Sequence, residues 1–171
     1  LIVSLILFLS MGFWINKIDT SADRILAEEE KEKISLEADR KYEKFRLTVQ
    51  PRIVSVKVNM NIYPESHSFR TDGIFTIKNR SDHSIDTLLV NYAFNVITKY
   101  SLDKESKFIS RDTVAHFDII LLNDKLAPGD SLKLSFEVEN IPNTVLHKNS
   151  PVERNGTFIT SEIYPGLGYY S

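Results

Sequence analysis

Residues 126–142 read LAPGDSLKLSFEVENIP, and this stretch decides the fold. Residues 128–130 are Pro-Gly-Asp, a turn signal, because proline presets φ while glycine and aspartate tolerate turn conformations. After the turn, apolar and polar residues alternate strictly, which indicates a strand with one buried and one wet face. The residues expected to face inward are Leu132, Leu134, Phe136 and Val138, and those expected to face outward are Lys133, Ser135, Glu137 and Glu139.

Two segments nearer the N-terminus carry the same period of two. Residues 51–64, PRIVSVKVNMNIYP, predict a half-buried strand. Its apolar positions are Val54, Val56, Val58, Met60 and Ile62. Residues 68–84, SFRTDGIFTIKNRSDHS, predict a second strand with Phe69, Phe75 and Ile77 on one face, followed by a polar turn.

Two further segments are more continuously apolar. Residues 85–97, IDTLLVNYAFNVI, are typical of a central strand buried on both faces, and residues 114–123, VAHFDIILLN, predict another strand. Five or more short strands separated by turn signals favour an antiparallel β-sandwich in a mainly β fold. Residues 52–160 are therefore expected to be mostly strand, with no helix longer than two turns.

The N-terminal end differs in composition from the strand region. Residues 1–15 carry no charge. Trp14, near the end of this run, and Lys17, just after it, are residue types that settle at a membrane interface. We interpret residues 1–16 as a truncated transmembrane helix, because the chain begins without methionine and the apolar run is short for a bilayer. A signal-peptide core and a buried helix are the alternatives.

Residues 17–48 contain no glycine or proline and are rich in Glu, Lys, Ala and Leu, which predicts a charged juxtamembrane helix. Thr20 and Asp23 resemble a capping box at its start. The charge run over residues 28–33 is interpreted as the solvated face of a stalk, with an electrostatic docking site as the alternative. The predicted organisation is a transmembrane helix at 1–16, a stalk at 17–48 and the sandwich at 49–171.

The sequence contains little that could carry chemistry. The net charge of −2 gives no basic field for nucleic acid, and the absence of cysteine excludes disulfides and thiolate metal sites. The four histidines (His67, His83, His116 and His147) have no metal-binding spacing, and each is interpreted as a structural or surface residue. His116 and Asp118 are two apart and are expected to share a strand face, but no nucleophile motif accompanies them. No catalytic, cofactor-binding or metal residue is assigned.

The order of the segments resembles that in the N-terminal β-sandwich of zinc aminopeptidases typified by aminopeptidase N. The segments VSVKVNMNIYP, GIFTIKN, LAPGDSLKLSFEVEN, NGTFI and YPGLGY follow one another as in that family. The chain is also similar to bacterial membrane proteins in which an ABC-type exporter permease is followed by such a region. In those proteins a last transmembrane helix runs through a charged helix into the sandwich. The resemblance covers about residues 40–171.

The resemblance implies a non-catalytic sandwich that positions and partly walls a zinc aminopeptidase-like domain. The family's Gly-x-Met-x-Asn and H-E-x-x-H motifs are absent and would lie beyond Ser171, so zinc and any peptidase activity would belong to the longer protein. The implied partners are the membrane, a downstream catalytic-type domain of the same chain and an ABC ATPase subunit. The implied location is the bacterial inner membrane, with the sandwich in the periplasm.

The C-terminal stretch NGTFITSEIYPGLGYYS, residues 155–171, is the candidate site under this resemblance. Its glycines permit tight turns or close approach, and its aromatics suit an interface. We interpret it as a hinge and interdomain contact patch made of Phe158, Tyr164, Gly166, Gly168, Tyr169 and Tyr170. The patch predicts that Tyr169 and Tyr170 are exposed; the alternative is an ordinary loop whose tyrosines pack on their own domain.

Two other functions remain open from the sequence. One is a stand-alone immunoglobulin-like binding module on a membrane stalk, which would recognise a protein or peptide through its loops or edge strands. The other is a periplasmic adaptor of a transporter.

Overall fold

The computed structural model describes residues 4, 6–14, 28–94, 96–140 and 150–169. Residues 6–14 are helical. The elements that follow are α2 (Glu28–Tyr42), the 3-10 turn η1 (Glu43–Phe45), β1 (Arg52–Tyr63), η2 (Pro64–Ser66), β2 (Ser68–Lys78), β3 (Ile85–Asn91), β4 (Ile97–Leu102), β5 (Ser106–Asp112), β6 (Phe117–Leu126), β7 (Ser131–Asn140), β8 (Val152–Glu153), β9 (Gly156–Thr157), η3 (Ser161–Ile163) and β10 (Gly166–Leu167).

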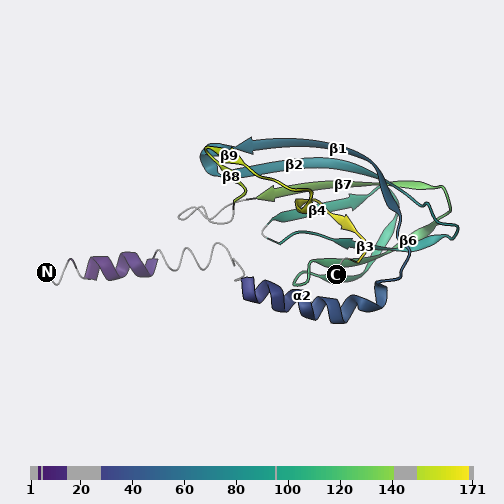
Figure 1. Ribbon diagram of the computed structural model, residues 1–171, viewed down its shortest axis with the longest axis horizontal. Helices are drawn as coiled ribbons and strands as arrows, with labels where there is room; N and C mark the ends of the chain where they lie inside the picture. The colour runs from purple at the N-terminus through teal and green to yellow at the C-terminus, as the bar shows by residue number, and fades with distance from the viewer. Residues whose placement is uncertain (1–3, 5, 15–27, 95, 141–149, 170–171) are drawn as a thin grey trace.

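The strands form two antiparallel four-stranded sheets and a small ribbon (Figure 1). The first sheet, sheet A, has the order β1-β2-β7-β4; the second, sheet B, has the order β10-β3-β6-β5; β8 and β9 pair with each other. Buried side chains from both sheets form one core cluster, so the predicted antiparallel β-sandwich is confirmed. Within the described part of residues 52–160, the only helix is the three-residue η2.

The predicted faces of β7 and β2 are those of the structure. Leu132, Leu134, Phe136 and Val138 are buried, and the residues between them are exposed or half-buried. Phe69, Phe75 and Ile77 of β2 are buried on the same side of sheet A. These side chains meet those of sheet B, including Leu88, Val90 and Ile120. The alternation of apolar and polar residues in the sequence therefore correctly predicted the core residues that β2 and β7 of sheet A contribute.

The apolar segment 85–97 does not form one strand. β3 ends at Asn91 in sheet B, and Ile97 begins β4 in sheet A. Within β3, Leu88 and Val90 face the core while Leu89 faces the opposite side, so its burial on both faces is confirmed. The strand predicted from Val114 begins only at Phe117, because His116 adopts a left-handed φ of 52° that ends extended pairing. Edge strand β5 was not predicted.

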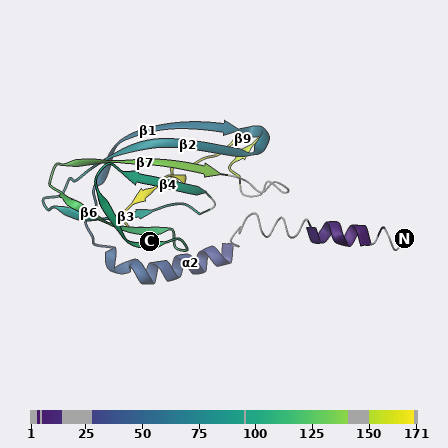
Figure 2. The same ribbon diagram turned by 180° about the vertical axis from the view of Figure 1, so that it is seen from behind.

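Helix α2 packs on the outer face of sheet B, the face opposite the core (Figures 1 and 2). Tyr42 is only 3% exposed, and its ring centroid lies 4.4 Å from that of Phe117. Leu89 completes the small cluster beneath the helix. The predicted helix is confirmed over Glu28–Tyr42, whereas its predicted start, with Thr20 and Asp23, lies outside the described residues. The end of α2 is thus packed against the sandwich, while Glu30, Glu32 and Lys33 of the charge run are exposed.

Asp112, at the end of β5, holds the end of α2 in place. Its carboxylate accepts hydrogen bonds from Lys41 Nζ at 2.7 Å and from the Tyr42 hydroxyl at 2.7 Å. It also accepts the backbone N–H groups of Val114 and Ala115. Burial alone would raise the pKa of Asp112, but these hydrogen bonds outweigh burial and hold the pKa well below its ordinary value.

Residues 6–14 form a short helix whose described apolar side chains are exposed; among them are Phe8, Phe13 and Trp14. No helix within the described residues has both the length and the apolar character that a bilayer span requires. The transmembrane helix predicted for residues 1–16 is therefore not supported, since nine helical residues span only about 14 Å. Residues 1–3, 5, 15 and 16 of that prediction lie outside the described part.

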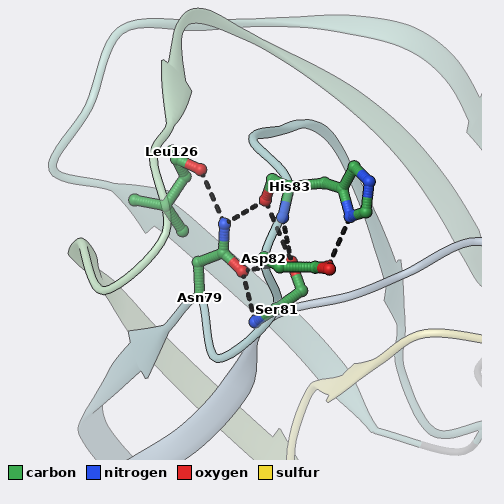
Figure 3. A network of polar contacts seen from close by, with 5 residues as sticks. All are labelled: Asn79, Ser81, Asp82, His83 and Leu126. Atoms are coloured by element: carbon green, nitrogen blue, oxygen red, sulfur yellow. Dashed lines mark hydrogen bonds and ion pairs between the residues drawn. The ribbon is translucent and has the colours of Figure 1, made fainter.

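Asn79 joins the two sheets at one end of the sandwich (Figure 3). It follows β2 of sheet A, and its side-chain Nδ2 donates to the carbonyl of Leu126, the last residue of β6 in sheet B, at 2.8 Å. Nδ2 also donates to His83 O at 2.7 Å, while Oδ1 accepts from Ser81 N and Ser81 Oγ at 2.9 and 2.7 Å. Residues 79–81 (Asn-Arg-Ser) and 155–157 (Asn-Gly-Thr) both match the Asn-x-Ser/Thr glycosylation sequon. Because the Asn79 side chain is fully buried, the first of these sequons is a structural element.

Candidate functional site

The segment 150–169, which contains the described part of the C-terminal stretch, runs along the sandwich towards sheet B (Figure 2). It starts at the tip of the β1–β2 hairpin, where the Nδ1 of His67 lies 3.0 Å from Val152 O and Arg154 pairs with Glu65 at 2.9 Å. Ile159, Ile163 and Tyr164 then pack against the core. At its end, β10 pairs with β3 in sheet B.

The predicted contact residues fall into two groups. Phe158 is 80% exposed and is available to a partner. The ring of Tyr164 is half-buried, with its centroid 5.5 Å from that of Phe136 and 6.4 Å from that of Phe75. Tyr169 packs against the cluster under α2, and its hydroxyl donates to Asp39 Oδ1 at 3.0 Å. Tyr169 therefore follows the alternative of a tyrosine packed on its own domain, and Tyr170 lies outside the described residues.

The two predicted glycines have separate physical reasons. A β-carbon on Gly166 would clash with the carboxamide of Asn91, the residue that it faces in the β10–β3 pair. A β-carbon on Gly168 would make only an ordinary van der Waals contact, at 3.7 Å from Gln50 Cγ, but Gly168 adopts a φ of +95°, which L-residues rarely occupy. Its carbonyl accepts a hydrogen bond from Asn91 Nδ2 at 2.9 Å. Both glycines let the C-terminal stretch lie against sheet B.

An uncovered apolar surface lies instead on β1, the edge strand of sheet A. The register with β2 pairs Ile53 with Ile77, Val56 with Phe75 and Ile62 with Phe69. Directly opposite residues of an antiparallel pair share a face, so these β1 side chains point to the core side of the sheet. We define the β1 apolar face as Ile53, Val56, Val58, Met60 and Ile62.

The β1 apolar face is on the core side of its sheet and yet remains accessible. Val56 is 59% exposed, Ile62 42% and Ile53 39%, while Val58 and Met60 are half-buried. The alternation in the sequence correctly predicted which side chains share this face, except that a bulge between Ile53 and Ser55 displaces Val54. Its predicted burial is wrong for Val54, Val56 and Ile62, which lie on an edge strand with β2 as its one paired neighbour among the described strands.

Among the described strands, none pairs with the backbone of β1 on its outer side. The strand is twelve residues long, or about 40 Å, and its single neighbour in sheet A is β2. Long edge strands invite pairing with another chain unless charges, prolines or bulges protect them. β1 has one bulge, and its two charged side chains, Arg52 and Lys57, are exposed, so protection is limited to the bulge near one end and these two side chains.

The described residues bring together no chemistry-bearing group on this surface. Within them, no three His, Asp or Glu side chains are placed to hold a metal ion. His83 is exposed beside Asp82, His67 contacts Val152 and Glu153, and His147 lies outside the described part. His116 precedes β6 and does not share a strand face with Asp118, contrary to the sequence prediction.

Asp118 instead forms a buried acid–phenol pair that the sequence did not indicate. Its side chain is fully buried, and Oδ2 accepts a hydrogen bond from the Tyr100 hydroxyl at 2.5 Å across the two sheets. Arg111 Nε lies 3.5 Å from the same oxygen. Burial and the bond to Asp118 raise the pKa of Tyr100. Because Tyr100 belongs to β4 of sheet A and Asp118 to β6 of sheet B, we interpret the pair as a bond that joins the sheets.

The fold and the surface together define a β-sandwich domain with an uncovered apolar edge. Among solved structures, the chain is similar to a mutant of a two-domain M1 zinc metallopeptidase bound to L-tryptophan, at 10% identity and a TM-score of 0.41. The similarity covers 54% of this chain and 21% of that one, so the chain spans about a fifth of its length. No protein-family model and no curated protein matches the chain.

Proposed function

We propose that this chain is a non-catalytic, membrane-tethered β-sandwich that positions and partly walls a further domain of the same protein. The observation that carries the proposal is the β1 apolar face, which lies on the core side of sheet A and is left exposed. Contiguous exposed apolar surface on a folded domain marks an interaction site. The occupant that we propose is a zinc aminopeptidase-like domain downstream in the chain.

The size of the face favours an occupant that is covalently linked. Fully burying a Val, Ile or Met side chain gains about 1.5–3 kcal/mol, so covering five that are half-buried or exposed gains roughly 3–6 kcal/mol. A separate protein would lose translational and rotational freedom worth at least about 4 kcal/mol on binding. A domain of the same chain avoids most of that cost, because the linkage makes the contact intramolecular.

The membrane tether is supported by the N-terminal residues. The described side chains of residues 6–14 are apolar or small and exposed, and no described part of the sandwich covers them. A lipid bilayer is the occupant that we propose for this helix. The charged helix α2 would then connect the membrane segment to sheet B, against which its end is packed.

The kind of parent protein rests on the order of the strand segments in the sequence. We propose an ABC transporter permease fusion of the bacterial inner membrane, with the sandwich in the periplasm and an ABC ATPase subunit as a further partner. Zinc and peptidase chemistry, where present, belong to the downstream domain. The sandwich itself covers one side of the downstream domain and fixes the orientation of that domain.

The test uses the full-length protein and a matched pair of β1 variants. Val56→Lys places a charge on the β1 apolar face, and Ser55→Lys places the same charge one residue away on the wet face. In the isolated chain both changes should alter stability by no more than about 0.5 kcal/mol, since both sites are exposed. In the full-length protein, Val56→Lys should speed limited proteolysis between the sandwich and the next domain, whereas Ser55→Lys should not. Equal proteolysis of the two variants would contradict the proposal.

The second candidate is a stand-alone module that captures an extended peptide. The unpaired outer edge of β1 favours it, because an added strand would find a row of free backbone groups. This candidate predicts that a full-length protein leaves β1 accessible and that the isolated chain binds extended peptides. The proteolysis experiment therefore separates the two functions.

A further inference from the structure

A cavity of about 220 Å³ lies between α2 and the outer face of sheet B, away from the β1 apolar face. Four segments build it: α2, the end of β3 with the residues after it, the turn before β6, and the end of the C-terminal stretch. The side chains that matter for its chemistry are Asp39, Tyr42, Tyr92, Phe94, His116 and Tyr169. Because the segments are distant in the sequence, the cavity exists only in the folded domain.

Half of the residues that line the cavity carry aromatic rings, and several of these rings pack against one another. The imidazole centroid of His116 lies 4.4 Å from the ring of Phe94 and 4.8 Å from the ring of Tyr92. On the opposite wall, Tyr42 packs on Phe117 at 4.4 Å. Aromatic faces carry negative electrostatic potential, which attracts cations of low hydration.

The charge of the lining points to the same kind of ligand. Asp39 is the one carboxylate among the lining residues, and no lysine or arginine lines the cavity. The Tyr169 hydroxyl donates to Asp39 Oδ1, which leaves Oδ2 for another partner. His116 is neutral at pH 7, since burial lowers its pKa, and its Nδ1 lies 3.0 Å from the carbonyl of Ala93.

We propose that this cavity binds a small quaternary or tertiary alkylammonium ion the size of choline. An apolar cavity of about 150 Å³ accommodates benzene, so 220 Å³ leaves room for one such ion without a large attached group. The ammonium methyl groups contact the rings of Tyr92 and Phe94, and Asp39 balances the charge. This site is independent of the β1 apolar face and of the proposed interdomain contact.

The experiment titrates the chain with choline and with 3,3-dimethyl-1-butanol, its uncharged counterpart of nearly equal shape, and follows the resonances of the cavity residues by NMR. Choline should bind saturably and at least about tenfold more tightly than the alcohol, as cation–aromatic contacts within a desolvated site imply. Equal affinity for the two compounds, or no saturable binding of choline, overturns the proposal.

Two variants and a control assign the binding to this cavity. Asp39→Asn keeps an acceptor for the Tyr169 hydroxyl but removes the charge, and should weaken choline binding about fivefold or more. Asp72→Asn removes an exposed carboxylate on β2 and should leave binding unchanged. Ala38→Leu fills the cavity from α2 and should abolish binding, which keeps the test decisive if Asp39→Asn unfolds. Unchanged affinity in Ala38→Leu overturns the assignment.

Discussion

Replacing Asn79 by alanine tests whether the two sheets depend on the polar bridge between them. The Asn79 side chain is fully buried and makes four hydrogen bonds, to Leu126, His83 and Ser81. Alanine leaves the carbonyl of Leu126 without its buried donor, at a cost of about 1–3 kcal/mol. The remaining bonds are near the surface, where water replaces them at a net loss of about 0.5–1 kcal/mol each. The free energy of unfolding should therefore fall by about 2.5–6 kcal/mol, with a central value of about 4 kcal/mol.

Urea unfolding followed by far-UV circular dichroism is the assay, because the single tryptophan, Trp14, lies in the N-terminal helix and does not report on the sandwich. With a denaturant slope of about 1.5–2 kcal/mol per molar, the midpoint should fall by about 2 M. Asn155→Ala is the control, since Asn155 is exposed and is the asparagine of the other sequon. A loss below about 1 kcal/mol for Asn79→Ala would refute the reasoning that one buried carbonyl depends on this side chain.

Three further predictions concern the tether, the C-terminal stretch and the α2 contact. The 171-residue chain should sediment with lipid vesicles, and deleting residues 1–27 should leave it in the supernatant; equal sedimentation argues against a tether. Gly166→Ala should destabilise the fold by about 1–3 kcal/mol, because the new β-carbon would clash with Asn91. Gly156→Ala is the control: a β-carbon there has open space around it, so the substitution should leave the melting temperature unchanged. The lowered pKa of Asp112 stabilises the fold above the unfolded pKa of about 3.9, and this stability is lost as the pH falls below that value. Asp112→Asn should therefore lower the melting temperature at pH 7 and make the melting temperature fall less steeply towards acid pH. An unchanged dependence of the melting temperature on pH would contradict this prediction.

The sequence predicted the sandwich because its inner strands follow the simplest rule of a sheet. The inward-facing apolar side chains of β7 and β2 have a neighbour on both sides and a facing sheet, so alternation and burial coincide there. In β1 the same alternation predicted burial that does not occur at Val54, Val56 and Ile62. The pattern states which side chains share a face, but the position of the strand within the sheet decides whether that face is covered.

The candidate site was harder to predict than the fold, because it depends on contacts between distant segments. The tyrosines near the C-terminus were predicted to form an interface. The Tyr169 hydroxyl instead donates a hydrogen bond to Asp39, which is 130 residues away in the sequence. The cavity under α2 combines residues from four segments, and nothing in their spacing indicates that they meet. The pair of Asp118 and Tyr100 joins opposite sheets and is likewise invisible to a local pattern.

Cysteine labelling of the full-length protein tests the central claim most directly, since the described chain contains no cysteine of its own. Val56→Cys reports on the β1 apolar face, and Ser55→Cys reports on the wet face of the same strand. Labelling by a maleimide reagent is read at each site by mass spectrometry, in the isolated chain and in the full-length protein. The account predicts that both sites react readily in the isolated chain and that only the Val56→Cys site is protected in the full-length protein. A Val56→Cys site that reacts as fast in the full-length protein as in the isolated chain would contradict the claim that this face holds another domain.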